Sequence, residues 1–128
     1  MTLQVELVSP ERILFSGEAT LVLCRTTEGE IEFLTGHAPF VGALAESAVR
    51  IQLDDGTTEL AAVHGGIVEV NNNRVILLCD VAELASMIDR QRAEQAREDA
   101  ERRVAAGEDA GAEVALRRAN VRLQVASV

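Results

Sequence analysis

The six-residue run from Ile88 to Ala93 contains the side chains best placed to do chemistry. It reads Ile-Asp-Arg-Gln-Arg-Ala, so Asp89 and Arg92 stand three residues apart. Two side chains at that spacing share one face of a helix. A carboxylate there can accept a hydrogen bond from an adenine amino group or a ribose hydroxyl, and an arginine fork can bind phosphate. The pair therefore predicts either a nucleotide contact or a local ion pair.

Other charged side chains in the last third of the chain extend this candidate site. Glu83 precedes the run, and Arg118 and Arg122 lie on a second expected helix. A helical hairpin would bring the two sets together. The alternative is a solvated helix face with intrahelical ion pairs, each worth only a few tenths of a kcal/mol. The charge pattern alone favours that alternative.

Catalytic and metal sites are not expected. His37 and His64 lie in or beside turns that contain glycine or proline, and neither has a nucleophile in a recognisable elbow. The histidines and cysteines lack the short spacing of a zinc site, and the glycines form no nucleotide-binding loop. Cys24 and Cys79 fall in apolar runs, where buried free thiols are expected.

The charge of the chain argues against nucleic acid as a partner. The 128 residues carry a net charge of −9, with 12 arginines and no lysine. Binding phosphates along a nucleic acid needs a basic stripe. Residues 1–82 carry 4 arginines against 12 acidic residues, and residues 83–128 carry 8 against 9. Since no secretory signal precedes the first apolar run and no apolar run reaches 18 residues, we expect a cytoplasmic protein.

The first 82 residues are expected to form eight to ten short strands. Apolar and polar residues alternate in most of them, and no helical segment intervenes. Asp55-Gly56 and the run of asparagines at 71–73 are strong hairpin turns. Arg12 to Phe15 is expected to be a separate short strand that Ser16-Gly17 closes. This pattern is typical of an antiparallel β-sandwich or flattened barrel of about ten strands.

The remaining residues, 83–128, are expected to form a second domain, an α-helical hairpin. Apolar residues recur at helical spacing before Gly107, and again from about Ala112. Many of them are alanine, and each missing CH₂ forfeits roughly 0.8 kcal/mol of burial. We therefore expect a weakly docked hairpin that can come loose. One set of apolar positions is Ala93, Ala96, Ala100 and Val104, and the other is Ala115, Leu116, Ala119 and Leu123.

Several motifs, in this order, make the chain resemble the ε subunit of F-type ATP synthases, whose mitochondrial equivalent is called δ. The motifs are Val8-Ser9-Pro10, Phe15-Ser16-Gly17, the run TTEGEIEFLTGHAPFVGAL from Thr26 to Leu44, HGGIVEV from His64 to Val70, and IDRQRA.

The resemblance implies a non-catalytic rotor subunit of a proton-translocating synthase. Its sandwich would couple the γ subunit to the membrane-embedded c-ring, with Glu28, Glu30 and His37 as contacts to them. Its helices would reach toward the catalytic β and α subunits and restrain ATP hydrolysis. The protein would then lie at the cytoplasmic face of the cell membrane, attached only through the complex.

The resemblance also implies a regulatory ATP site. The matching residues are Glu83, Ile88, Asp89, Arg92, Ala93, Arg118 and Arg122. Seven residues after Arg92, where nucleotide-binding members have a phosphate-contacting arginine, this chain has Asp99, and an acid repels phosphate. We therefore expect ATP to be at best a weak regulatory ligand, and no other cofactor. A stand-alone β-sandwich that senses a nucleotide is the alternative function.

Overall fold

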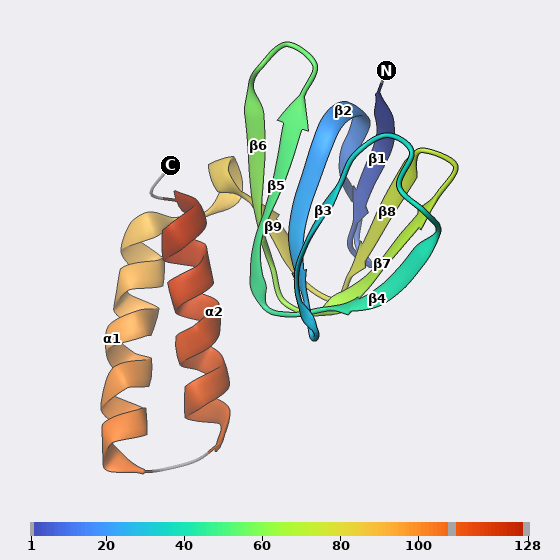
Figure 1. The fold of residues 1–128 in the computed structure, drawn as a ribbon. Helices are drawn as coiled ribbons and strands as arrows, with labels where there is room; N and C mark the ends of the chain where they lie inside the picture. The colour runs from blue at the N-terminus through green and yellow to red at the C-terminus, as the bar shows by residue number, and fades with distance from the viewer. Residues whose placement is uncertain (1, 108–109, 127–128) are drawn as a thin grey trace.

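The computed structural model describes residues 2–107 and 110–126, which form a β-sandwich followed by two helices (Figure 1). The predicted fold class is confirmed. The strands are β1 (Leu3–Val8), β2 (Ile13–Thr26), β3 (Gly29–Phe33), β4 (Phe40–Leu44), β5 (Ser47–Leu53), β6 (Thr58–Val63), β7 (Gly66–Asn71), β8 (Arg74–Cys79) and β9 (Ala82–Leu84). A short 3₁₀ turn η1 (Ala85–Met87) then leads to α1 (Arg90–Ala106) and α2 (Ala110–Ala126).

The strands follow the order β1-β8-β7-β4-β2-β5-β6-β9, with β3 added beside β2. β1 also pairs with the first half of β2, so that the long strand β2 belongs to both layers of the sandwich. All neighbours are antiparallel except β1 and β8, which run parallel.

β2 corrects one expectation from the sequence. Ser16-Gly17 does not end a short strand, because β2 continues through it from Ile13 to Thr26. Ser16 pairs with Glu6 and Gly17 pairs with Val5 of β1. The hydrogen bonds of the neighbouring strand thus override a local dipeptide that is typical of turns.

The core of the sandwich is aliphatic, as the composition requires. In most strands alternate residues point inward, and Phe33 is the largest of the fully buried side chains. Cys24 and Cys79 are free and buried in this core, as predicted. Burial raises the pKa of each thiol to about 12, because the apolar surroundings disfavour a thiolate. The main buried residues are Leu3, Val5, Leu7, Val22, Val49, Ile51, Val63, Val68, Val75 and Leu77.

The predicted hairpin turns are present. Asn72 and Asn73 both have positive φ, 51° and 59°, which is the pattern of the turn that suits the twist of a two-residue hairpin. Gly56 has a φ of 88° in the turn between β5 and β6. At the start of β7, a Cβ on Gly66 would lie 2.8 Å from the Cα of Cys79, so that only glycine fits there.

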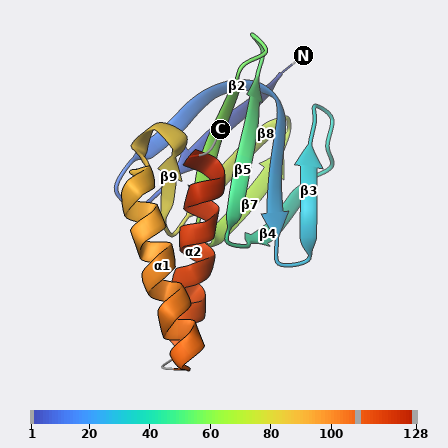
Figure 2. The ribbon, with the colours of Figure 1, turned by 90° about the vertical axis from the view of Figure 1, so that its left-hand side faces the viewer.

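The two helices pack against each other and α2 also packs on the sandwich. α1 begins after Asp89 and ends at Gly107, whose φ of 66° is the usual left-handed C-terminal conformation. α2 contacts β5, β6 and η1. The residue boundary expected between 82 and 83 falls within β9, which pairs with β6 and so carries the chain out of the sheet (Figure 2).

Candidate functional site

A pocket of about 310 Å³ lies where β9, η1 and the two helices meet. Six of the seven residues predicted from the sequence as a nucleotide site line it: Glu83, Ile88, Asp89, Arg92, Ala93 and Arg122. Met87 and Ala96 complete the lining. The sequence predicts neither of these two as site residues, because Ala96 is an apolar helix position like its neighbours and Met87 lies just before the run from Ile88 to Ala93.

Asp89 occupies the N-cap of α1. Its Oδ1 accepts a hydrogen bond from the backbone N–H of Arg92, 3.1 Å away. This bond satisfies one of the backbone donors that a helix leaves free at its start. The spacing of three residues between Asp89 and Arg92 therefore has a structural role, and it orients the first turn of α1 toward the pocket.

Glu83 and Arg122 join β9 to α2 across the pocket. Arg122 Nε donates to Glu83 Oε1 at 2.5 Å, and both side chains are more than two thirds buried. This ion pair uses two of the groups that a nucleotide would need. Arg92 is exposed and makes no side-chain ion pair within residues 2–107 and 110–126, so its guanidinium remains available to an anion.

Arg118 is the one predicted member that does not line the pocket. Its Nε lies 3.8 Å from Glu46 Oε1, in the connection between β4 and β5. Arg118 and Arg122 are one helical turn apart and hence share a face of α2. Each arginine pairs with a different glutamate of the sandwich. Arg118 contacts Glu46 and Arg122 contacts Glu83.

His64 lies buried beside these contacts. Its Nε2 is 3.6 Å from Glu83 Oε1, and its side chain has no exposed surface. The pKa of His64 is lowered, first because burial disfavours the imidazolium and then because Arg122 is close. The sequence placed His64 beside a turn and gave no sign of this position under α2.

Asp99 does not face the pocket. It accepts from Arg102 and lies 3.4 Å from Gln95 Nε2, both on α1. The position seven residues after Arg92 therefore contributes no positive charge to the pocket. The charged groups that line it are two carboxylates and two guanidinium groups, which leaves no net positive charge for a polyphosphate.

The three residues expected to contact γ and the c-ring lie on or beside β3, an edge strand that pairs with β2 and is drawn at the side of the sheet away from α1 in Figure 2. Glu28 is in the turn before β3, and the exposed Glu30 lies 3.8 Å from Arg25. His37 follows the other end of β3, where its ring packs edge-on against Phe33 at a centroid distance of 4.9 Å. The structure thus places Glu28 and His37 at opposite ends of one edge strand.

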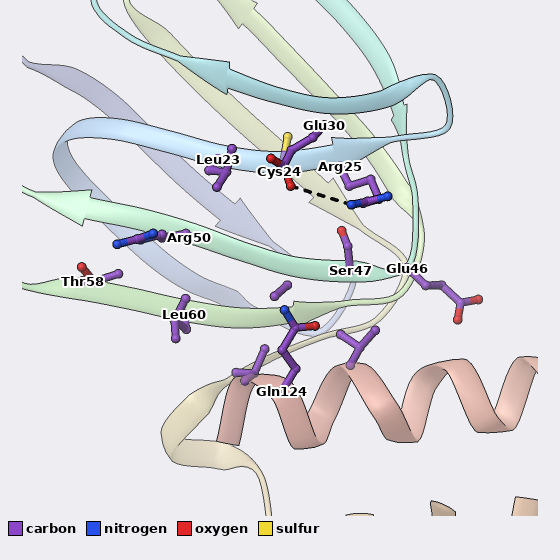
Figure 3. Close-up of a pocket in the computed structure, with 13 residues that line it drawn as sticks. Leu23, Cys24, Arg25, Glu30, Glu46, Ser47, Arg50, Thr58, Leu60 and Gln124 are labelled. Carbon is purple, nitrogen blue, oxygen red and sulfur yellow. Dashed lines mark ion pairs between the residues drawn. The ribbon is translucent and has the colours of Figure 1, made fainter. Parts of the chain in front are cut away.

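A larger pocket of about 640 Å³ lies between α2 and the outward face of β2, β5 and β6 (Figure 3). Leu23, Leu60 and Val125 contribute to its apolar part, while Arg25 and Glu30 form an ion pair on one side. The sequence did not predict this pocket, because its lining combines strand residues with Val121, Gln124 and Val125 of α2, which are far apart along the chain.

Comparison with known protein families identifies this architecture. The model of the ATP synthase delta/epsilon chain β-sandwich domain matches residues 2–85, and that of the delta/epsilon chain long α-helix domain matches residues 86–127. The chain belongs to the ε subunits of F-type ATP synthases. These ε subunits are non-catalytic, in agreement with the absence of a catalytic motif in the sequence.

Individual relatives agree along nearly the whole chain. The ε chain of Streptomyces avermitilis is 50% identical over 125 residues, which cover 98% of this chain and 95% of the relative. That of Halalkalibacterium halodurans is 41% identical over 130 residues, covering 98% and 97%.

A chain in the Euglena gracilis mitochondrial ATP synthase shares the fold of this ε subunit. Its TM-score is 0.84 at 22% identity, and the match covers 99% of this chain and 82% of that one. Neither described helix is long and apolar enough to cross a membrane.

Proposed function

We propose that this ε subunit works in the central stalk, where its sandwich couples the c-ring to the γ subunit and its hairpin restrains ATP hydrolysis by the α and β subunits. It does so at the cytoplasmic face of the cell membrane of a proton-translocating synthase, attached only through the complex. The Euglena structure that shares the fold is titled as an OSCP/F1/c-ring assembly, and a more distant Tetrahymena thermophila match, with a TM-score of 0.55 and 12% identity, as a central stalk/c-ring.

The observation that carries this proposal is an apolar row on the sheet that faces away from the hairpin. Directly opposed residues on neighbouring strands point to the same face of a sheet. Three members of this row are large and exposed, by 45% or more of their surface. A contiguous apolar patch of this kind marks an interaction site. From β4 through β7, β8 and β1 to β2, the row is Ala43, Ile67, Leu78, Val8 and Ile13.

Such a surface supports docking on a large partner such as γ. In Figure 1 the strands β4, β7 and β8 lie on the side of the sandwich opposite α1 and α2. A partner bound there would leave the hairpin free to move. Glu28 and Glu30 add exposed acidic groups along β3, and we assign these two residues, with His37, to contacts with the c-ring and γ.

The joint between the hairpin and the sandwich supports the inhibitory role. Its apolar part consists of Ala62, Val121 and Val125, with a few partly buried neighbours. The alanine contributes one methyl group, so the burial is small for a helix of 17 residues. Two ion pairs, Arg122 with Glu83 and Arg118 with Glu46, complete the joint. A contact of this size can open reversibly.

ATP is assigned to the pocket at β9 as a weak regulatory ligand. Asp89 and Arg92 both line this pocket, but Asp89 caps α1, Arg122 is engaged by Glu83 and Asp99 points elsewhere. We expect millimolar affinity, on the order of −4 kcal/mol.

The same pocket favours a second candidate, a stand-alone sandwich that senses a nucleotide. The apolar row distinguishes the two candidate functions, because a rotor subunit needs such a docking surface and a free-standing sensor does not. An affinity-tagged chain should recover γ and the c-ring from solubilised membranes. Ile67→Asp should abolish recovery by placing a charge in the row, whereas Ala105→Asp, which adds the same charge on exposed α1, should not. Failure of the wild type to recover either partner would exclude the rotor role.

The inhibitory role is tested by removing the hairpin from the assembled synthase. The deletion should begin at residue 88, because β9 hydrogen-bonds to β6 and Ala82 is part of the core. We expect the deletion of residues 88–128 to leave assembly intact and to raise ATP hydrolysis. Unchanged hydrolysis in a fully assembled complex would show that the hairpin does not restrain the enzyme.

A further inference from the structure

His64 lies at the joint between the sandwich and α2. It follows β6 directly, and the alternation of side chains along a strand puts Ala62 and His64 on the same outward face. Ala62 packs against Val121 and Val125 of α2. The His64 backbone N–H donates to the carbonyl of Val81 at 2.9 Å, which fixes the residue in place. The imidazole is therefore covered by the docked helix.

Four charged groups surround this ring. On one side are Glu83 of β9, whose Oε1 is 3.6 Å from Nε2, and Arg122 of α2, which donates to that same oxygen. On the other are Arg118 of α2 and Glu46 of the β4–β5 connection. The sandwich supplies both carboxylates and the helix supplies both guanidinium groups.

Within the described residues the ring makes no hydrogen bond. Neither Nδ1 nor Nε2 of His64 has a hydrogen-bond partner there, and the buried Glu46 Oε2 and Arg118 Nε also lack one, since Arg118 and Glu46 approach each other only at ion-pair distance. A neutral imidazole tolerates such a site far better than an imidazolium, which would lose its hydration and face two arginines. Release of α2 would remove both arginines, admit water, and leave the two carboxylates beside the ring.

We propose that protonation of His64 controls the docking of the hairpin: a proton on its imidazole favours detachment of α2 from the sandwich. The residue then regulates the restraint of hydrolysis proposed above, and this role rests on that function. The release itself is a property of the isolated chain and can be measured without the synthase.

The direction of the pH dependence follows from the two states. In the docked state the pKa of His64 is lowered by burial and by Arg122, whereas in the released state it returns toward its ordinary value of 6.5. The docked state therefore binds fewer protons. Docking is fully favoured above pH 6.5 and weakens as the pH falls below 6.5 toward the docked pKa, by at most about tenfold per pH unit.

The test measures the docked fraction of the full chain between pH 7.5 and 5.5. Spin labels on Asp54→Cys and Glu98→Cys report the distance between the sandwich and α1, since both positions are exposed. The native cysteines are buried, and their raised pKa keeps them unreactive. We expect the released population to grow severalfold on acidification in the wild type and to stay constant in His64→Gln.

His37→Gln is the matched control, because His37 lies on the β3–β4 connection away from the hairpin, and it should keep the wild-type response. A docked fraction independent of pH in the wild type, or an equal response in His64→Gln, would overturn the proposal. If His64→Gln fails to dock at pH 7.5, the NMR titration of the wild-type imidazole decides. A midpoint below 6.5 supports the release, and one at or above 6.5 refutes it. None of these outcomes bears on whether deleting the hairpin raises hydrolysis.

Discussion

Val125→Ala should loosen the hairpin without unfolding the sandwich. Val125 is fully buried in the small cluster with Ala62 and Val121, separate from the core between the sheets. The substitution removes two carbon atoms, worth about 1.6 kcal/mol of burial, and leaves a small cavity. A total of about 2 kcal/mol corresponds to roughly a thirtyfold fall in the ratio of docked to released hairpin.

Limited digestion with trypsin can measure this equilibrium between the docked and the released hairpin. Trypsin cleaves after arginine or lysine, and this chain has no lysine and carries 8 of its 12 arginines in residues 83–128. When opening is fast relative to cleavage, the rate of cleavage follows the population of the open form. We therefore expect Val125→Ala to raise the rate of cleavage within the hairpin by about the same factor, roughly thirtyfold, while cleavage after Arg25 and Arg50 stays slow.

The matched control removes the same atoms from an exposed site. Val41 is 71% exposed on β4, so Val41→Ala should leave hairpin cleavage at the wild-type rate. The reasoning is refuted if Val125→Ala leaves cleavage of the hairpin unchanged. It is equally refuted if cleavage of the sandwich accelerates in parallel, because the two apolar clusters would then unfold as one.

Three further outcomes are expected. Gly66→Ala should lower the free energy of unfolding in urea by at least about 2 kcal/mol, since its Cβ would meet β8 and its φ of 133° suits glycine, whereas Gly56→Ala in an open turn should cost about half as much. Calorimetry should show millimolar ATP binding that Arg92→Ala weakens and Arg97→Ala does not; micromolar binding would contradict the balance of charge in the pocket. Cys24 and Cys79 should resist a thiol reagent at pH 8 until the sandwich unfolds, because their pKa of about 12 leaves almost no thiolate.

The strands and turns of the sandwich were predictable because their signals are local. Asp55-Gly56 and the three asparagines have backbone preferences that act within a few residues, and the structure places turns at both. The continuity of β2 through Ser16 was not predictable, since its pairing partner is ten residues away. β9 was missed for another reason. Three residues are too few to show an alternating pattern.

The candidate site was predictable as a set of residues but not as a geometry. Four residues of the run from Ile88 to Ala93 line one pocket together with Glu83 and Arg122. Helical periodicity places Arg118 on the same face as Arg122, yet it cannot reveal that Glu46 lies opposite the first arginine and Glu83 opposite the second. The burial of His64 could not be predicted for the same reason. It depends on how α2 docks, and that docking leaves no local pattern in the sequence.

The small alanine-rich joint also bears on solubility after the hairpin leaves. Release uncovers a small set of apolar side chains, which are Ala48, Leu60 and Ala62 on the sandwich and Val121 and Val125 on α2. A patch this small does not drive aggregation, and the net charge of −9 keeps the molecules apart. A leucine-rich joint would hold the helices more tightly, but each opening would expose two large apolar surfaces that promote aggregation. The modest contact therefore allows many cycles of opening and closing without loss of protein to precipitation.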